Sequence, residues 1–352
     1  MPEQKEELTI IGSLKTLMML LVVLYHCAAL WSNAGWFNQA PAMTSAFLPV
    51  VTEYLNDIHI YVFTFASGYL FYYTNFIKRN EFHAGTVIKK RFRKLIIPYI
   101  IITICWLLPF ELIYFQESVL QLLFRFALGT APRQLWFLLM LFMVNLMFCL
   151  WISLIKKKLS LRLGMIILYG VYIGGAFLIR FNVPDIFQII TSLRYLIFFF
   201  FGYALCRDGT TLLKKVNIVV VIILHLTVFA LVYYLNHYCQ HPVRLASVFL
   251  TPLISLSGIV VFYKIVGAVK CRMNRKDQVQ KQNLIVLLFK KNEFSIYFFH
   301  QQWIWVVISL MNYEYISPYC IIVVGFVVSV VLSVLMSEGL KRIPGVKKAL
   351  SI

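Results

Sequence analysis

Ten apolar stretches, each roughly 20 residues long, run through the whole chain and are separated by polar connectors. About 20 apolar residues of helix are needed to cross a hydrocarbon core of about 30 Å, and in lipid only helices and closed barrels satisfy their own backbone groups. The composition agrees, because 61% of the 352 residues are hydrophobic and only 13% are charged, against about a quarter charged in soluble domains. We therefore predict an all-α, polytopic membrane helix bundle of about ten transmembrane helices. The expected spans lie near residues 10–32, 57–77, 95–115, 135–155, 163–180, 186–206, 216–235, 245–268, 292–312 and 317–338.

Lysine and arginine are concentrated in alternate connectors, at 78–94, 156–162, 206–215 and 270–283, and in the C-terminal tail. Alternate connectors lie on the same side of a membrane, and basic loops mark the cytoplasmic side. Both termini are therefore expected in the cytoplasm, and the net charge of +19 needs no nucleic-acid partner. We expect residues 1–352 to form a single transmembrane domain without an appended soluble domain, with the first apolar stretch retained as a helix.

Lys15 and His26 lie eleven residues apart on the first apolar stretch. Eleven residues are about three helical turns, so both side chains share one helix face about 16 Å apart. An ionisable side chain inside a membrane helix costs about 2.5–3.5 kcal/mol on insertion scales, which makes it a candidate for function. Histidine also exchanges protons near neutral pH. Snorkelling at the helix end would explain Lys15 equally well, and an interhelical hydrogen bond would explain His26.

A basic run at residues 90–94 leads into the third span, with Pro98 in its first turn. Such a run usually fixes topology. It can also bind a phosphorylated molecule, because arginine forms bidentate contacts to phosphate. Arg91 and Lys94 are three residues apart and are expected to project from one side of a helix.

The second and ninth spans also contain histidines, His59 and His300. Ser67 and Gly68 follow His59 by about two helical turns, and small residues of this kind usually serve close helix packing in lipid. Arg133 and Arg194 lie at helix ends away from the basic connectors. Each could snorkel or bind an anionic group.

Motifs of soluble enzymes and metal sites are missing from the sequence. It contains no nucleotide-binding loop, zinc-protease motif or serine-hydrolase elbow in a supporting context. The seven cysteines show no C-x-x-C spacing, so neither a metal site nor a disulfide framework is expected.

In this order the residues resemble the acyltransferase 3 family of bacterial integral-membrane O-acyltransferases, and most of all its fucose 4-O-acetylase-like branch. The resemblance covers nearly the whole chain. It departs from the family pattern at Gly12, where an acidic residue is common, and at Lys94, which stands in place of an arginine. The matching elements are the basic-x10-His motif at Lys15 and His26, the second-span element with His59, Ser67 and Gly68, the R-x-x-R-L-x-x-P-Y element at Arg91, Lys94, Leu95, Pro98 and Tyr99, the LWFL element containing Trp136, and SIYFFH ending at His300.

The resemblance implies transfer of an acyl group, usually acetyl from acetyl-CoA, to a sugar hydroxyl in a cell-surface polysaccharide or lipid-linked glycan. Acetyl-CoA would be a co-substrate taken up at the cytoplasmic face of a bacterial inner membrane, with no permanently bound cofactor and no metal. His26 would be the general base, assisted by Lys15, and Arg91 and Lys94 would bind the donor. Residues expected to orient the acceptor or stabilise the oxyanion are His59, Ser67, Trp136, His300, Arg133 and Arg194.

Two other functions remain open at this level. A transporter or flippase-like protein for a glycolipid or small molecule would also place histidines and arginines along a membrane pathway. The sequence shows no internal repeat of the kind common in transporters. A catalytically inactive sensor or scaffold is favoured slightly by the departures at Gly12 and Lys94.

Overall fold

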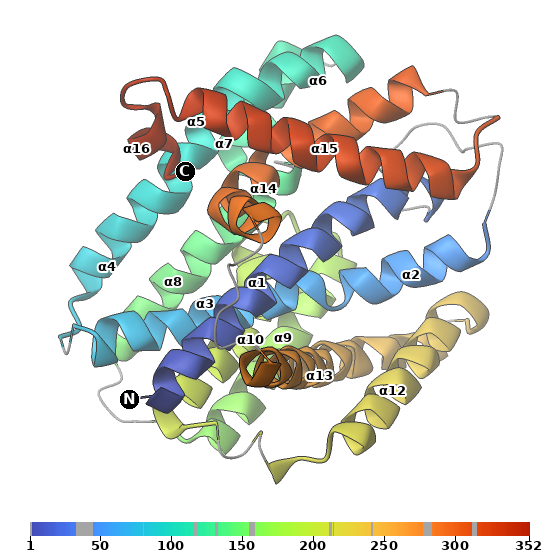
Figure 1. The fold of residues 1–352 in the computed structure, drawn as a ribbon. Coiled ribbons are helices and arrows are strands. Elements are labelled where there is room, and N and C mark those ends of the chain that lie inside the picture. The colour runs from blue at the N-terminus through green and yellow to red at the C-terminus, as the bar shows by residue number, and fades with distance from the viewer. Residues whose placement is uncertain are drawn as a thin grey trace. The chain divides into compact units, whose positions relative to one another are not determined.

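The computed structural model describes residues 2–32, 45–79, 81–115, 118–130, 133–154, 159–210, 213, 215–240, 242–276, 284–311 and 315–352. Within these ranges every regular element is a helix (Figure 1). Eight helical segments in this part of the chain are long and apolar enough to cross a membrane. The prediction of an all-α, multi-pass membrane protein is confirmed, whereas the cytoplasmic orientation of the termini stays a prediction.

The helices group into two compact units, which are described separately. The first unit comprises Met1–Ala66 and Thr210–Ser337, and the second comprises Ser67–Gly209 and Glu338–Ile352. Helices α3 and α15 contribute residues to both units.

In the first unit, helix α1 packs against α2, α13 and α14, and α12 packs along α13 (Figure 1). Helix α12 begins where the Asn217 side chain accepts a hydrogen bond from the Val219 N–H at 2.9 Å, a typical N-cap. The elements of this unit are α1 (Pro2–Ala28), η1 (Ala29–Trp31), α2 (Phe47–Asn56), the first part of α3 (His59–Tyr72), α12 (Ile218–Tyr238), η7 (Val243–Leu245), α13 (Ala246–Lys276), α14 (Leu284–Leu310) and most of α15 (Pro318–Leu340).

In the second unit, α10 packs against α8 and α9, and α4 packs against α8. Buried aromatic rings form part of its core, with the Phe148 ring 5.0 Å from Phe199 and 5.6 Å from Phe71. The elements are the end of α3, η2 (Tyr73–Ile77), α4 (Ala84–Arg91), η3 (Phe92–Ile96), α5 (Ile97–Ile102), η4 (Thr103–Leu107), α6 (Leu108–Phe115), α7 (Val119–Leu128), η5 (Arg133–Leu135), α8 (Trp136–Leu154), α9 (Leu161–Arg180), η6 (Ile186–Gln188), α10 (Ile189–Asp208) and α16 (Val346–Leu350).

The third span differs most from expectation. Its helix begins at Ala84, inside the predicted connector 78–94, and continues to Phe115 through two π-helical turns, η3 and η4. Pro98 therefore lies inside a continuous helical run rather than at its start. A π-helical turn commonly accommodates such a local break in the hydrogen-bond ladder, because Pro lacks a backbone N–H.

Two expected spans, near 57–77 and 292–312, correspond to helical residues 59–77 and to the helix Leu284–Leu310, and neither is among the eight apolar segments; residue 312 lies outside the described residues. The α-helical part of α3 is only 14 residues long before η2 begins. Helix α14 carries Lys290, Lys291 and Glu293 in its first half, which shortens its uninterrupted apolar stretch.

Candidate active site

Helix α14 packs against α1 in the first unit and supplies a carboxylate for the conspicuous lysine of α1. The Lys15 Nζ lies 3.8 Å from Glu293 Oε2. The neighbouring Thr16 hydroxyl donates a hydrogen bond to the other oxygen of the same carboxylate. Lys15 is thus engaged by another helix, which snorkelling alone does not explain.

Three helical turns further along α1, His26 meets a second histidine from α14. Its Nδ1 lies 2.9 Å from His300 Nε2, and the two ring centroids are 4.9 Å apart. His26 is 9% exposed and His300 is fully buried. The same pair of helices therefore joins both ionisable residues of the basic-x10-His motif to partners on α14.

His59 lies next to the His26–His300 pair, and the Tyr25 ring contacts both His26 and His59. The ring of Tyr25 lies 4.9 Å from the His26 ring and 5.0 Å from the His59 ring. The His59 Nδ1 donates to the Leu55 carbonyl one turn earlier. We call His26, His59, His300 and Tyr25 the histidine cluster. Hydrogen-bonded imidazoles in a buried site can accept and donate protons during a reaction.

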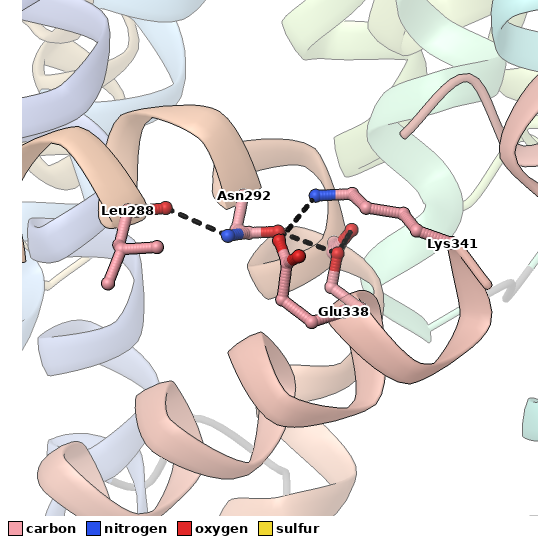
Figure 2. Close-up of polar contacts among 6 residues, drawn as sticks. Leu288, Asn292, Glu338 and Lys341 are labelled. Atoms are coloured by element: carbon pink, nitrogen blue, oxygen red, sulfur yellow. Dashed lines mark hydrogen bonds and ion pairs between the residues drawn. The ribbon is translucent and has the colours of Figure 1, made fainter.

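A polar contact between α14 and α15 fixes the register of α14. The Ser337 hydroxyl donates to the Asn292 amide oxygen at 2.7 Å and lies 2.8 Å from the Ser295 hydroxyl. The Asn292 amide also donates a hydrogen bond, 2.9 Å long, to the Leu288 carbonyl, and Figure 2 draws this bond between the two labelled residues. It also draws the ion pair of Glu338 with Lys341, which belongs to the second unit. Asn292 is next to Glu293 in sequence, so the contact helps to hold that carboxylate in place.

The predicted donor-binding residues lie in the second unit. Arg91 is half-buried at the end of α4, which packs against α8, whereas Lys94 is exposed within the π-helical turn η3. The i→i+5 hydrogen bonds of that turn change the angle between successive residues. The α-helical spacing that predicted a common face for Arg91 and Lys94 therefore does not hold there. Trp136 begins α8, with its ring 5.9 Å from the Tyr195 ring of α10.

A cavity of about 330 Å³ lies in the second unit, between the end of η2 and the first turn of α4. Its volume is at the lower end of the range for small-molecule sites. The lining residues are Asn75, Arg79, Glu81, His83, Thr86 and Val87.

Arg133 and Arg194, the two arginines predicted to lie away from the basic connectors, have local partners in the second unit. Arg133 forms a two-pronged contact to Glu111, at 2.8 and 2.7 Å, and Glu111 is only 2% exposed. The Arg194 guanidinium lies 5.0 Å from the Tyr172 ring centroid and donates to the Tyr172 hydroxyl at 3.2 Å. Both contacts are consistent with a structural role for these arginines. Neither contact bears on whether they also bind the acceptor.

Ser67 and Gly68 lie in the part of α3 that belongs to the second unit. A Cβ at Gly68 would be 1.9 Å from the Phe199 carbonyl oxygen, so α3 and α10 approach closely there. Gly68 is accordingly a packing residue. Ser67 is half-buried on the same helix.

Sequence reasoning missed Glu293 and Tyr25. Glu293 lies two helical turns before His300, a spacing that places both on one face of α14. The signal was therefore present in the sequence, as an acid and a histidine seven residues apart on an apolar helix. Among the described residues, no three or more His, Cys, Asp or Glu side chains are grouped to hold a metal ion.

The fold and the paired ionisable residues define a multi-pass membrane protein with a buried histidine cluster. Comparison with protein families assigns the chemistry, because residues 9–338 match the acyltransferase domain of the acyltransferase 3 family. The chain belongs to this family of membrane acyltransferases. No curated protein and no solved structure matches the chain closely enough to be compared.

Proposed function

We propose that the protein transfers an acetyl group from acetyl-CoA, bound at the cytoplasmic face of a bacterial inner membrane, to a sugar hydroxyl. The acceptor is a cell-surface polysaccharide or a lipid-linked glycan, as the resemblance to the fucose 4-O-acetylase-like branch suggests. The observation that carries the proposal is the histidine cluster, where His26 is buried and hydrogen-bonded to His300 at 2.9 Å. A buried, oriented imidazole is suited to general base catalysis.

In the proposed reaction, His26 removes the proton from the acceptor hydroxyl as its oxygen attacks the thioester carbonyl. The new C–O bond forms and the C–S bond breaks. The CoA thiolate then takes the proton from the His26 imidazolium, so the histidine is regenerated. General base catalysis of this kind contributes about 10²–10⁴-fold to the rate.

The donor is proposed to be held by basic residues at the cytoplasmic side. Arg91 and Lys94 are the residues that match the family element, and Arg79 lines the cavity beside the start of α4. Arginine and lysine both bind phosphate, so the three suit the phosphates of CoA. Lys15, held by Glu293, is proposed to stabilise charge on the donor during transfer.

His59 is proposed to orient the acceptor, because it lies in the histidine cluster with its Nδ1 engaged by the Leu55 carbonyl. Its Nε2 is then the ring nitrogen able to accept a hydrogen bond from a sugar hydroxyl. Ser67 and Trp136 remain proposed acceptor residues on the resemblance alone. Arg194 remains one because it is an arginine at a helix end away from the basic connectors.

The test is to supply radiolabelled acetyl-CoA to inverted membrane vesicles containing the protein and to follow label into extracted glycans. We expect label in glycan only when the protein is present, released by mild base as an ester is. Vesicles without the protein are the control, and unlabelled succinyl-CoA as competitor reports acyl selectivity. Equal labelling with and without the protein would contradict the proposal.

A further inference from the structure

The hydrogen bonds of His300 fix which of its ring nitrogens carries the proton. Its Nδ1 lies 2.8 Å from the Ile296 carbonyl oxygen and 3.0 Å from the Tyr297 carbonyl oxygen. A carbonyl oxygen only accepts hydrogen bonds, so the Nδ1 must carry the hydrogen.

A neutral imidazole has a single N–H, so the Nε2 of His300 must accept. The neutral form is expected, because His300 is fully buried and an unpaired buried charge is costly. The atom 2.9 Å from this acceptor is His26 Nδ1, which must therefore donate. His26 is then left with its lone pair on Nε2.

The opposite proton order is disfavoured by the same contacts. It would place the unprotonated Nδ1 of His300 against two carbonyl oxygens, so three electron-rich atoms would face one another. It would also place the hydrogen of His26 on its Nε2, and this nitrogen could then not accept a proton from the acceptor hydroxyl.

We propose that His300 is a positioning residue that holds His26 as the Nδ1–H tautomer, so that His26 Nε2 is the atom that removes the acceptor proton. This inference rests on the proposed function for the identity of the base, but its tautomer claim is independent of activity. It replaces the sequence-based expectation that His300 touches the acceptor or the oxyanion. A backbone carbonyl accepts a hydrogen bond from His300, and His300 accepts one from His26. His300 thus orients the proposed base, as the third residue of a catalytic triad does.

The direct test is solid-state NMR of the whole protein, labelled with ¹³C,¹⁵N-histidine and reconstituted in lipid vesicles. His26 is assigned by comparison with His26→Gln. We expect its Nδ1 to be protonated and its Nε2 unprotonated, although free neutral histidine prefers hydrogen on Nε2. A protonated Nε2 on neutral His26 would overturn the proposal, whether or not the protein transfers acetyl.

Two variants at position 300 provide a rescue test. In His300→Gln the amide oxygen can still accept from His26 Nδ1, whereas in His300→Leu nothing can. We expect His300→Gln to keep the His26 tautomer and kcat within about tenfold. We expect His300→Leu to lose the tautomer and about 10²-fold or more in kcat, with the KM for acetyl-CoA unchanged, as for other wrongly oriented bases.

The outcomes separate this inference from the proposed function. Absence of acetyl transfer by the wild type would defeat the proposed function, while the NMR result would still decide the tautomer claim. Equal kcat in the two position-300 variants, with the His26 tautomer unchanged in both, would overturn the positioning role. If His300→Leu fails to fold, the wild-type NMR and His300→Gln still decide.

Discussion

Two polar pairs join helix α1 to helix α14. Lys15 is paired with Glu293, and His26 is hydrogen-bonded to His300. Partner residues reduce the cost of placing ionisable groups in an apolar environment. The pairs thus explain how two costly residues persist on one apolar helix.

The Lys15–Glu293 pair is expected to act as a unit in acyl transfer. Lys15→Met and Glu293→Gln should each lower kcat, and the double variant should lose little more than the worse single variant, because the two residues share one interaction. The measurement is a double-mutant cycle of initial rates. Lys341→Met, which breaks an ion pair to Glu338 outside this site, is the control and should leave kcat unchanged. Fully additive losses would show that Lys15 and Glu293 act separately.

Arg133 is expected to stabilise the fold rather than to bind acceptor. Arg133→Gln leaves Glu111, 2% exposed, without its guanidinium partner, and breaking a buried pair costs about 3–5 kcal/mol. The thermal midpoint in detergent should fall, and Arg133→Leu combined with Glu111→Leu should recover much of the loss. The exposed Arg180, changed to Gln, is the control. An unchanged midpoint with a raised KM for acceptor would instead assign Arg133 to the substrate.

At the residue scale, the sequence was sufficient to select Lys15, His26, His59 and His300 as candidates, and their catalytic or binding roles stay predictions. It was not sufficient to assign their partners, because contact between α1 and α14 joins residues 274 positions apart. It also did not distinguish an arginine bound to a buried acid from one available to a ligand, as Arg133 and Glu111 show.

At the element scale, close approach of α3 and α10 depends on one glycine. In Gly68→Ala the added Cβ would lie 1.9 Å from a backbone oxygen of Phe199, so the two helices must separate. We expect a large drop in thermal midpoint or a failure to accumulate in membranes. Gly170→Ala on α9 is the matched control, because nothing lies within 4 Å of its Cβ. Its midpoint should stay level or rise, since alanine favours helix. A stable Gly68→Ala protein would contradict the packing.

Most helix positions could be predicted because, in a membrane protein, an apolar stretch of about 20 residues directly indicates a spanning helix. The start of the third span could not, since residues 84–94 are polar and basic yet continue the helix. Local polarity indicated a connector, whereas packing of α4 on α8 supports a helix there. Two π-helical turns in that run are likewise invisible to a periodicity of 3.6 residues.

At the scale of the whole molecule, the distribution of basic residues predicts an orientation that native cysteines can report. Exposed Cys271 lies in a basic segment predicted to be cytoplasmic, and exposed Cys320, in the first turn of α15, is predicted to lie on the opposite side. In two variants, each with either Cys271 or Cys320 as its only cysteine and the others changed to serine, a membrane-impermeant maleimide added to spheroplasts should label only the Cys320 variant. Detergent should expose both, which is the control. Labelling of Cys271 in sealed spheroplasts would reverse the orientation.

If His26 is the general base of this acyltransferase, its replacement should slow acetyl transfer. The measurement compares the purified wild-type protein with His26→Gln in lipid vesicles, using radiolabelled acetyl-CoA and the glycan acceptor fraction. His225→Gln, which changes another buried histidine bonded to Ser257 and Tyr54, controls for folding. We expect a rate about 10²–10⁴-fold lower for His26→Gln and a near wild-type rate for the control. Equal rates for the wild type and His26→Gln would contradict this role of His26.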